Sequence, residues 1–325
     1  MKIISLFAGA GGMDLGFIKA GHKIIWANDN DKDCVESYKK YFVKKFKLSP
    51  DHIICGDIKL IDTEDIPYGD IVIGGFPCQG FSIANPYRHT KDGRNELYLE
   101  LLRVIKAKKP KYFVAENVQG LCSIGGYESK SDKQKGEGRI LKLILKDFKK
   151  AGYKVVWKVL DAANFGVPQH RRRIIILGTR KDLLLTIKHP NPTYTNKFEN
   201  LLKLPLYKNL GEAIGDLPEP GINNSFYNHI GTKHVVKING YIGNRKTDPN
   251  KPSPTIVGRG GGTGGPVIIP HPNGKRRLTV RETARLQCFP DDFEFLGSVS
   301  SCYRQIGNAV PWPLAYNIAK MIPIR

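Results

Sequence analysis

The sequence predicts an α/β protein with a doubly wound, mostly parallel sheet, followed by a smaller region that is rich in loops and expected to be rich in β-structure. Two observations predict this fold. Up to about residue 180, short apolar runs alternate with amphipathic segments of helical spacing, which is typical of parallel sheets covered by helices. After about residue 188, prolines and glycines multiply and the periodicity weakens. We therefore expect a first domain over residues 1–185, a second over 186–300, and a segment over 301–325 that completes the first.

The expected elements follow one another in a regular order. Strands are predicted at residues 2–7, 23–28, 52–57, 71–76, 111–117, 154–160 and 172–179, and helices at residues 12–21, 31–46, 95–108, 139–149, 279–287 and 308–322. In a doubly wound sheet the functional side chains gather at the carboxyl ends of the strands. The residues at those ends are therefore the first candidates for a site.

Composition narrows the class of partner. The chain has 325 residues and a formal net charge of +21, which favours a polyanion, with nucleic acid ahead of a membrane. The alternative is a generally lysine-rich surface with no ligand. No segment is long and apolar enough to span a bilayer, and the N-terminal apolar stretch is too short for a secretion signal. The six cysteines include no metal-ligand spacing, so we expect no metal and a reducing cytoplasm.

Three successive strand ends predict a nucleoside cofactor. The first is followed by a loop containing Gly9, Gly11 and Gly12, where bare backbone can approach a ligand at a helix N-terminus. The second ends at Asp29, which can take a pair of ribose hydroxyls, and the third offers Asp57 for an adenine amino group. The glycines lack the order of a dinucleotide fingerprint, which disfavours a nicotinamide cofactor. The alternative for each acid alone is helix capping.

Later strand ends carry reactive side chains. The fourth delivers Cys78, which is either an exposed thiol with a lowered pKa in a basic setting or a buried packing residue, as we expect for the other five cysteines. The fifth ends at Glu116, a carboxyl that can hydrogen-bond a base edge. Alternation sends Arg171 and Arg173 to one face at the start of the seventh strand, where they can hold an anion or a base carbonyl.

These motifs occur in a specific order. The glycine loop, the acid, "GDI", "PCQ", "ENV", "QHRRR", "RRLTVRETARLQCFP" and "GNAVP" resemble the C5-cytosine-specific DNA methyltransferase family in the compact form found in restriction–modification systems. The resemblance covers residues 2–178 and 277–319. It implies transfer of a methyl group from S-adenosylmethionine to C5 of a cytosine flipped out of a short specific duplex sequence, with S-adenosylhomocysteine as the product.

The resemblance also implies residue roles. Cys78 would attack C6, Glu116 would hold N3 and the exocyclic amine, and Arg173 would contact the cytosine carbonyl, while Arg171 steadies the Cys78 loop and a nearby phosphate. The cofactor pocket would consist of Phe7, Gly9, Gly11, Gly12, Asp29, Asn30, Asp57, Ile58, Pro77, Leu97 and Asn308. DNA contacts would come from Gln79, Ser82, Arg88 and Arg94 in a closing loop over residues 79–94, and from Arg245, Lys246 and Arg259 in a target-recognition region over residues 182–274.

Three departures from the family pattern lie outside the reacting centre. Asp29 stands where glutamate is commoner, Asn30 where an aromatic often stacks on the adenine, and Cys288 where glycine is frequent. The implied partner is double-stranded DNA, bound by a monomer in a prokaryotic cytoplasm, with a cognate restriction endonuclease as functional partner. A tRNA-methylating relative would carry a Cys-Phe-Thr triplet, which is absent, and a catalytically silent relative would lack the nucleophile. A nicotinamide dehydrogenase would explain neither the charge nor "PCQ".

Overall fold

The computed structural model describes residues 1–77, 97–198, 201–221, 225–231, 236, 246–258 and 269–324. Within these ranges the chain forms one sheet of seven strands in the order β3-β2-β1-β4-β5-β7-β6. The strands are β1 (Lys2–Leu6), β2 (Lys23–Asp29), β3 (Ile53–Cys55), β4 (Ile71–Gly75), β5 (Tyr112–Val118), β6 (Tyr153–Asp161) and β7 (Arg172–Arg180).

The sheet is parallel except at β7. Strand β1 pairs in parallel with β2 and β4, and β5 pairs in parallel with β4 and antiparallel with β7. Because β7 runs the other way, its first residues lie at the edge where β5 ends: Val118 is paired with Arg173, and Gly75 with Glu116. The predicted doubly wound, mostly parallel sheet is confirmed. The edge where β4 and β5 end also carries the first residues of β7.

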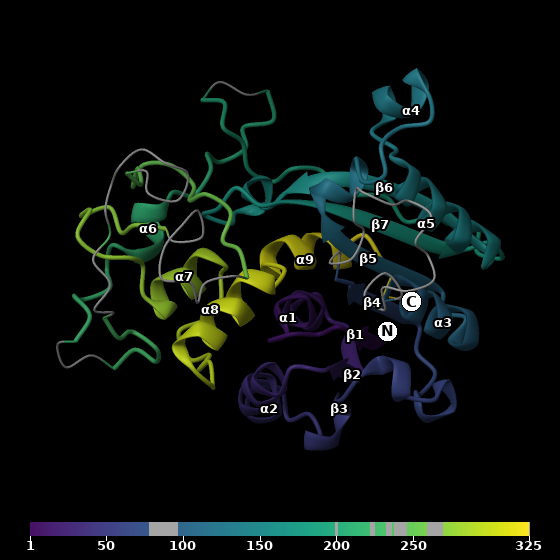
Figure 1. Cartoon of the computed structure of the whole chain (residues 1–325), viewed down its shortest axis with the longest axis horizontal. Coiled ribbons are helices and arrows are strands. Elements are labelled where there is room, and N and C mark those ends of the chain that lie inside the picture. Colours follow the sequence, from purple (N-terminus) through teal and green to yellow (C-terminus); the bar gives the residue numbers. More distant parts are fainter. Residues whose placement is uncertain are drawn as a thin grey trace.

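Helices cover both faces of the sheet (Figure 1). They are α1 (Gly12–Lys19), α2 (Lys32–Phe46), α3 (Leu97–Lys108), α4 (Lys130–Lys135), α5 (Arg139–Lys150), α6 (Leu210–Ile214), α7 (Val280–Leu286), α8 (Val299–Asn308) and α9 (Trp312–Ala319). Strand residues alternate between two apolar clusters, since Ile3 packs with α1, α2 and α9 while Ile4 packs with α3 and α5. None of the helices in the described ranges has the length and apolar character needed to cross a membrane.

The C-terminal helix lies against the first one, and the two are side by side in Figure 1. A Cβ on Gly16 would come within 2.5 Å of the Ala315 Cβ, so the two helices pack without room for a larger side chain. The sequence predicted a helix over residues 308–322, and the chain forms the shorter α9 within that range, with residues 309–311 left outside any helix. Proline cannot supply the amide that a continuous helix needs, so α9 begins after Pro311. Helix α8 was missed from the sequence.

The region after β7 is rich in loops, as predicted. Its described residues contain helices but no strand, and β-structure there is limited to isolated bridges such as Thr195 with Leu206 and Pro270 with Arg277. Part of this region packs on the first domain, because the rings of Tyr41 and Phe293 lie 4.7 Å apart. The domain boundaries at 185 and 300 stay predictions; the second of them falls inside α8.

Candidate active site

The loop after β1 is held by the acid at the end of β2. The amide of Gly9 donates to Oδ2 of Asp29 over 2.7 Å, and the amide of Asp31 donates to Oδ1 over 2.9 Å. Burial raises the pKa of the Asp29 carboxyl. Each carboxylate oxygen has a second lone pair, so both can accept a further hydrogen bond from a diol. A Cβ on Gly9, where φ is +54°, would meet nothing within 4 Å, so the loop is open on that side.

A second acid lies beneath this loop. Asp14, in the first turn of α1, is fully buried and accepts hydrogen bonds from Ser5 Oγ and Tyr38 Oη, each over 2.7 Å. Burial raises its pKa to about 6, although the two hydroxyls lower it. Asp14 had no role predicted from the sequence. The only sequence signal for a role was an acidic residue in the first turn of the helix after a glycine loop. Such a residue by itself also fits stabilisation of the helix dipole.

The end of β3 completes this half of the edge. The side-chain Nδ2 of Asn28 donates to the carbonyls of Ile54 and Gly56, over 3.1 and 2.9 Å, and so ties β2 to β3 and the turn after it. Asp57 caps the following short helix by accepting from the Lys59 amide over 3.0 Å. The exposed Asp57 side chain is therefore a helix cap. Asp29 is not one, because the residue that caps α2 is Asp31.

The other predicted cofactor residues differ in their exposure. Ile58 is buried, Leu97 is half-buried with Phe7 at the second apolar cluster, and Asn30, Pro77 and Asn308 are exposed. The segment between α8 and α9 reaches the glycine loop, since a Cβ on Gly12 would come within 2.4 Å of the Val310 carbonyl. The carboxylate and the open glycine loop fit a nucleoside that carries a ribose diol. In the described residues no three His, Cys, Asp or Glu side chains are placed to hold a metal.

The other half of the edge contains a nearly buried ion pair. Arg173 Nε lies 2.9 Å from Glu116 Oε1, and the two side chains are 11% and 10% exposed. A Cβ on Gly75 would come within 2.9 Å of Glu116 Oε2, so a glycine at the end of β4 gives the carboxylate its place. A paired carboxylate and guanidinium at this depth can present one donor and one acceptor to a planar ring.

Asn117 fixes the chain that leads to the predicted nucleophile. Its Nδ2 donates to the Phe76 carbonyl over 2.9 Å, and its Oδ1 accepts from the Val118 amide over 2.8 Å. Asn117 belongs to the "ENV" motif, but no role was predicted for it from the sequence. This contact holds the end of β4 beside β5, one residue before Pro77.

Arg171 is placed differently from Arg173. Its side chain is fully buried, and its Nη1 and Nη2 donate to the carbonyls of Ile256, over 2.7 Å, and Gly307, over 2.8 Å. Burial, with the nearby Arg173 charge, lowers the pKa of this guanidinium well below its usual range. Arg171 directly precedes β7, and Arg173 is the second residue of that strand. In the described part of the chain, however, Arg171 binds backbone carbonyls rather than an anion, so it ties separate segments together.

Several predicted site residues cannot be placed. Cys78, Gln79, Ser82, Arg88, Arg94, Arg245 and Arg259 lie outside the described residues. Lys246 is described and is exposed. Of the other cysteines, Cys34 and Cys302 are buried as expected, while Cys122 and Cys288 are half-buried. The prediction of burial is wrong for Cys55, which is exposed at the end of the short strand β3 because the sheet ends there.

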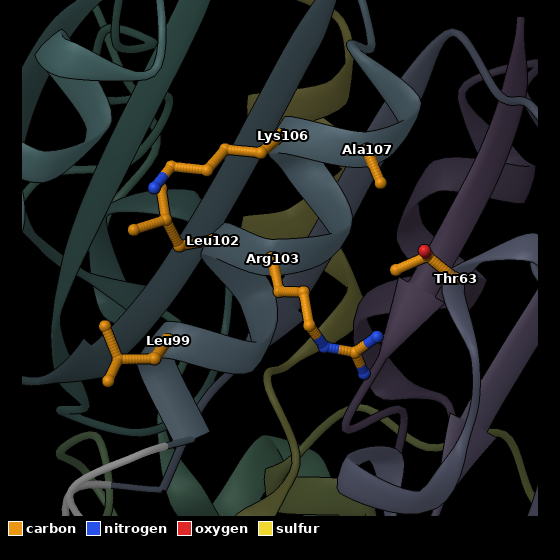
Figure 2. A pocket seen from close by; sticks show the side chains of 6 residues that line it. All are labelled: Thr63, Leu99, Leu102, Arg103, Lys106 and Ala107. Carbon is orange, nitrogen blue, oxygen red and sulfur yellow. The ribbon is translucent and has the colours of Figure 1, made fainter.

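A shallow groove lies apart from these residues. It measures about 450 Å³ and is lined by Thr63, Leu99, Leu102, Arg103, Lys106 and Ala107 (Figure 2). Arg103 donates to the carbonyls of Ile58 and Ile61, over 2.8 and 3.1 Å, and so joins α3 to the turn after Asp57. No predicted site residue lines the groove. The groove is connected to the predicted site through Arg103, which binds the backbone carbonyl of Ile58.

The fold and the site define a class of protein. It is an α/β protein in which a carboxylate and an open glycine loop suited to a nucleoside lie at one half of a sheet edge, and a nearly buried carboxylate–guanidinium pair lies at the other half. A family model described as C-5 cytosine-specific DNA methylase matches residues 1–323. The chain belongs to this family, whose methyl donor is S-adenosylmethionine, and is a cytosine-C5 DNA methyltransferase, which confirms the resemblance seen in its motifs.

Known relatives agree with this assignment, and a solved structure agrees with the fold. Type II methyltransferase M.NgoFVII of Neisseria gonorrhoeae is 40% identical over 344 residues, covering 99% of this chain and 86% of that protein. Type II methyltransferase M.FnuDI of Fusobacterium nucleatum is 35% identical over 350 residues, covering 99% and 94%. The crystal structure of a putative DNA modification methyltransferase from an E. coli prophage has a TM-score of 0.70 at 24% identity, covering 99% of this chain and 98% of that one. That last likeness shows the fold.

Proposed function

We propose that this methyltransferase modifies one cytosine in a short duplex sequence through a covalent adduct between Cys78 and C6, and that it serves as the modification enzyme of a restriction–modification system. The observation that carries the proposal is the Glu116–Arg173 pair at the edge of the sheet, directly beside the strand that leads to Cys78. The Type II names of its relatives support the second half. Its setting would be a prokaryotic cytoplasm, and a cognate endonuclease would be a functional partner of a monomeric enzyme.

The ion pair supports base recognition. The cytosine ring offers an N3 acceptor, an amino donor and a carbonyl acceptor along one edge. Glu116 would hold N3 and the amino group, while Arg173 would donate to the carbonyl. Stabilising charge at N3 and the carbonyl makes C6 more electrophilic, so the Cys78 thiolate forms a bond to C6. The base must leave the duplex for this contact, because its edge is otherwise paired.

The remaining steps restore the base. Bonding at C6 turns C5 into an enamine-like nucleophile. S-adenosylmethionine would supply the methyl group that bonds to C5 and would leave as S-adenosylhomocysteine. Loss of the C5 proton and departure of the Cys78 thiolate then regenerate an aromatic, methylated cytosine. Around the cofactor, Asp29 would bind the ribose diol, Gly9, Gly11 and Gly12 would keep the loop bare, and Arg171 would position the start of β7. Phe7, Asn30, Asp57, Ile58, Pro77, Leu97 and Asn308 would complete the pocket.

DNA recognition is proposed for the loop-rich region. Gln79, Ser82, Arg88 and Arg94 would approach the duplex from the segment after Cys78, and Arg245, Lys246 and Arg259 from the recognition region. The boundaries proposed for the two domains and the C-terminal segment are those predicted from the sequence. Of these DNA contacts, Lys246 is the one whose exposure the structure describes.

The test uses a mechanism-based trap. Bisulfite sequencing of plasmid from cells that express the chain first identifies the methylated sequence. Duplex DNA with 5-fluorocytosine at that position should then form a stable covalent adduct in the presence of S-adenosylmethionine, because fluorine cannot leave as a proton does. Cys78→Ser should abolish the adduct. An adduct that persists in this variant removes Cys78 from the mechanism, and unmethylated plasmid with methylated tRNA would move the substrate to RNA.

A further inference from the structure

A histidine beside the proposed base site is held in one orientation although half of its side chain is exposed. His170 lies two residues before β7, and its side chain is 48% exposed. Its amide donates to the Ser253 carbonyl over 2.9 Å, and its carbonyl accepts from Thr255 Oγ1 over 2.6 Å. The ring of Tyr207 packs edge-on against the imidazole, with the ring centroids 5.7 Å apart. A side chain fixed in this way is suited to bind a ligand, because little conformational freedom is left to lose.

One carboxylate orients this histidine together with an arginine. Asp161 ends β6 and is paired in register with Arg172 of β7. Its Oδ2 atom lies 3.0 Å from His170 Nδ1 and 3.6 Å from Arg172 Nε. Its Oδ1 atom accepts from the backbone amides of Arg171 and Ala163, over 3.0 and 3.3 Å. The two amides fix the carboxylate, and the carboxylate in turn places both cationic side chains.

The outer atoms of the two side chains remain available to a ligand. Arg172 is 64% exposed, and among the described residues neither side chain binds an acceptor other than Asp161. The atoms that remain are His170 Nε2 and the Nη atoms of Arg172. An anion beside Nε2 favours the doubly protonated ring, which then donates to the carboxylate with one nitrogen and to the anion with the other. A phosphate has several acceptor oxygens and can bind both side chains at once.

These side chains lie at the edge of the sheet where the cytosine is proposed to bind. Arg172 directly precedes Arg173, the partner of Glu116, and neighbouring Cα atoms are about 3.8 Å apart. Alternation along β7 turns the two arginines to opposite sides of the strand, so they cannot both contact the base. A flipped base stays attached to the sugar–phosphate backbone, so phosphates of the target strand come close to this edge.

We propose that His170 and Arg172, positioned by Asp161, bind a backbone phosphate of the duplex beside the target nucleotide. The inference rests on the proposed function, since it takes the substrate to be duplex DNA with a flipped cytosine. Phosphate contacts fix the position of a protein on DNA and carry no sequence information. The site therefore contributes affinity for any duplex, and the choice of sequence is made by other residues.

The experiment measures the binding of the full chain to two fluorescent duplexes by anisotropy over a range of salt concentrations. One duplex contains the sequence that bisulfite sequencing identifies, and the other has that sequence scrambled. Arg172→Gln should weaken binding to both duplexes by about tenfold. It should also reduce the slope of log affinity against log salt by about one. His170→Gln should weaken binding to both duplexes by a smaller factor.

The matched control is Arg180→Gln. Arg180 ends β7, at the opposite edge of the sheet, and its Nε lies 2.7 Å from Asp182 Oδ1. The control removes the same charge from the same strand, away from the proposed phosphate. It should retain the native affinity for both duplexes and the native salt slope.

Asp161→Asn tests the positioning role. Asparagine keeps an oxygen that accepts from the amides of Arg171 and Ala163 but loses the charge. Removal of a negative charge by itself strengthens DNA binding, whereas loss of the orientation weakens it. We expect binding to weaken by about threefold, with no further effect in a chain that already carries His170→Gln and Arg172→Gln.

Native affinity and salt slope in both His170→Gln and Arg172→Gln overturn the proposal. Weakening that is confined to the duplex with the methylated sequence also overturns it, because such a result indicates base reading. Stronger binding by Asp161→Asn overturns the positioning role. The 5-fluorocytosine adduct is followed in every variant at saturating DNA, and we expect it to form in all of them. Its absence from the native chain would be a failure of the proposed function, which the binding measurements do not depend on.

Discussion

The buried Asp14 carboxyl should make the stability of this protein fall as the pH rises. In the folded chain its pKa is raised from 3.8 to about 6, chiefly by burial. The neutral acid is therefore favoured by folding, and its contribution is fully present at pH values below the unfolded pKa. It is lost progressively as the pH rises through the folded pKa, because the folded chain must then hold a buried charge.

The magnitude follows from the difference between the two pKa values. About two units at about 1.4 kcal/mol each amount to about 3 kcal/mol. Asp14→Asn keeps the shape of the side chain and removes the ionisation. We expect the free energy of unfolding of the variant, relative to the native chain, to rise by about 3 kcal/mol between about pH 4 and pH 7. Any change in the hydrogen bonds to Ser5 and Tyr38 adds an offset that does not depend on pH.

The assay is urea unfolding of both chains at several pH values across this window. Tyr38→Phe provides a second perturbation of the opposite kind. Its hydroxyl lowers the Asp14 pKa, so its removal should raise that pKa further and extend the loss of stability to higher pH. Parallel curves of unfolding free energy against pH for the native chain and Asp14→Asn would refute the reasoning.

Two further predictions concern the active site and the substrate. Gly75→Ala places a Cβ 2.9 Å from Glu116 Oε2 and should push the carboxylate away from Arg173. We expect kcat to fall by about a hundredfold with little change in the KM for the cofactor. A kcat within about twofold of that of the native chain would contradict the role proposed for the Glu116–Arg173 pair. The net charge of +21 predicts that the affinity for DNA falls steeply with added salt, which fluorescence anisotropy measures. An affinity that does not depend on salt would show that these charges do not contact the DNA.

The sequence by itself determined the main elements and the chemical class of the site. Apolar periodicity reports which faces are buried, so the strands and most helices could be predicted from it, and motifs such as the glycine loop and "ENV" name residue types that the chemistry requires. Short or interrupted elements were harder. Strand β3 is only three residues long, helix α8 was missed, and α9 begins four residues later than predicted, because local propensity does not decide where tertiary contacts end an element.

The tertiary structure decided the partners. Asp29 and Asp57 look alike in sequence, each at a strand end, yet Asp29 accepts from the Gly9 amide while Asp57 caps a short helix. Arg171 and Arg173 are two residues apart, yet one binds carbonyls of distant segments and the other binds Glu116. The difference between the two arginines arises from the pairing of β5 with an antiparallel β7 and from the docking of residues 253–258 and α8 on the start of β7. Such contacts join residues far apart in the chain, and the burial pattern of a single segment carries no information about them.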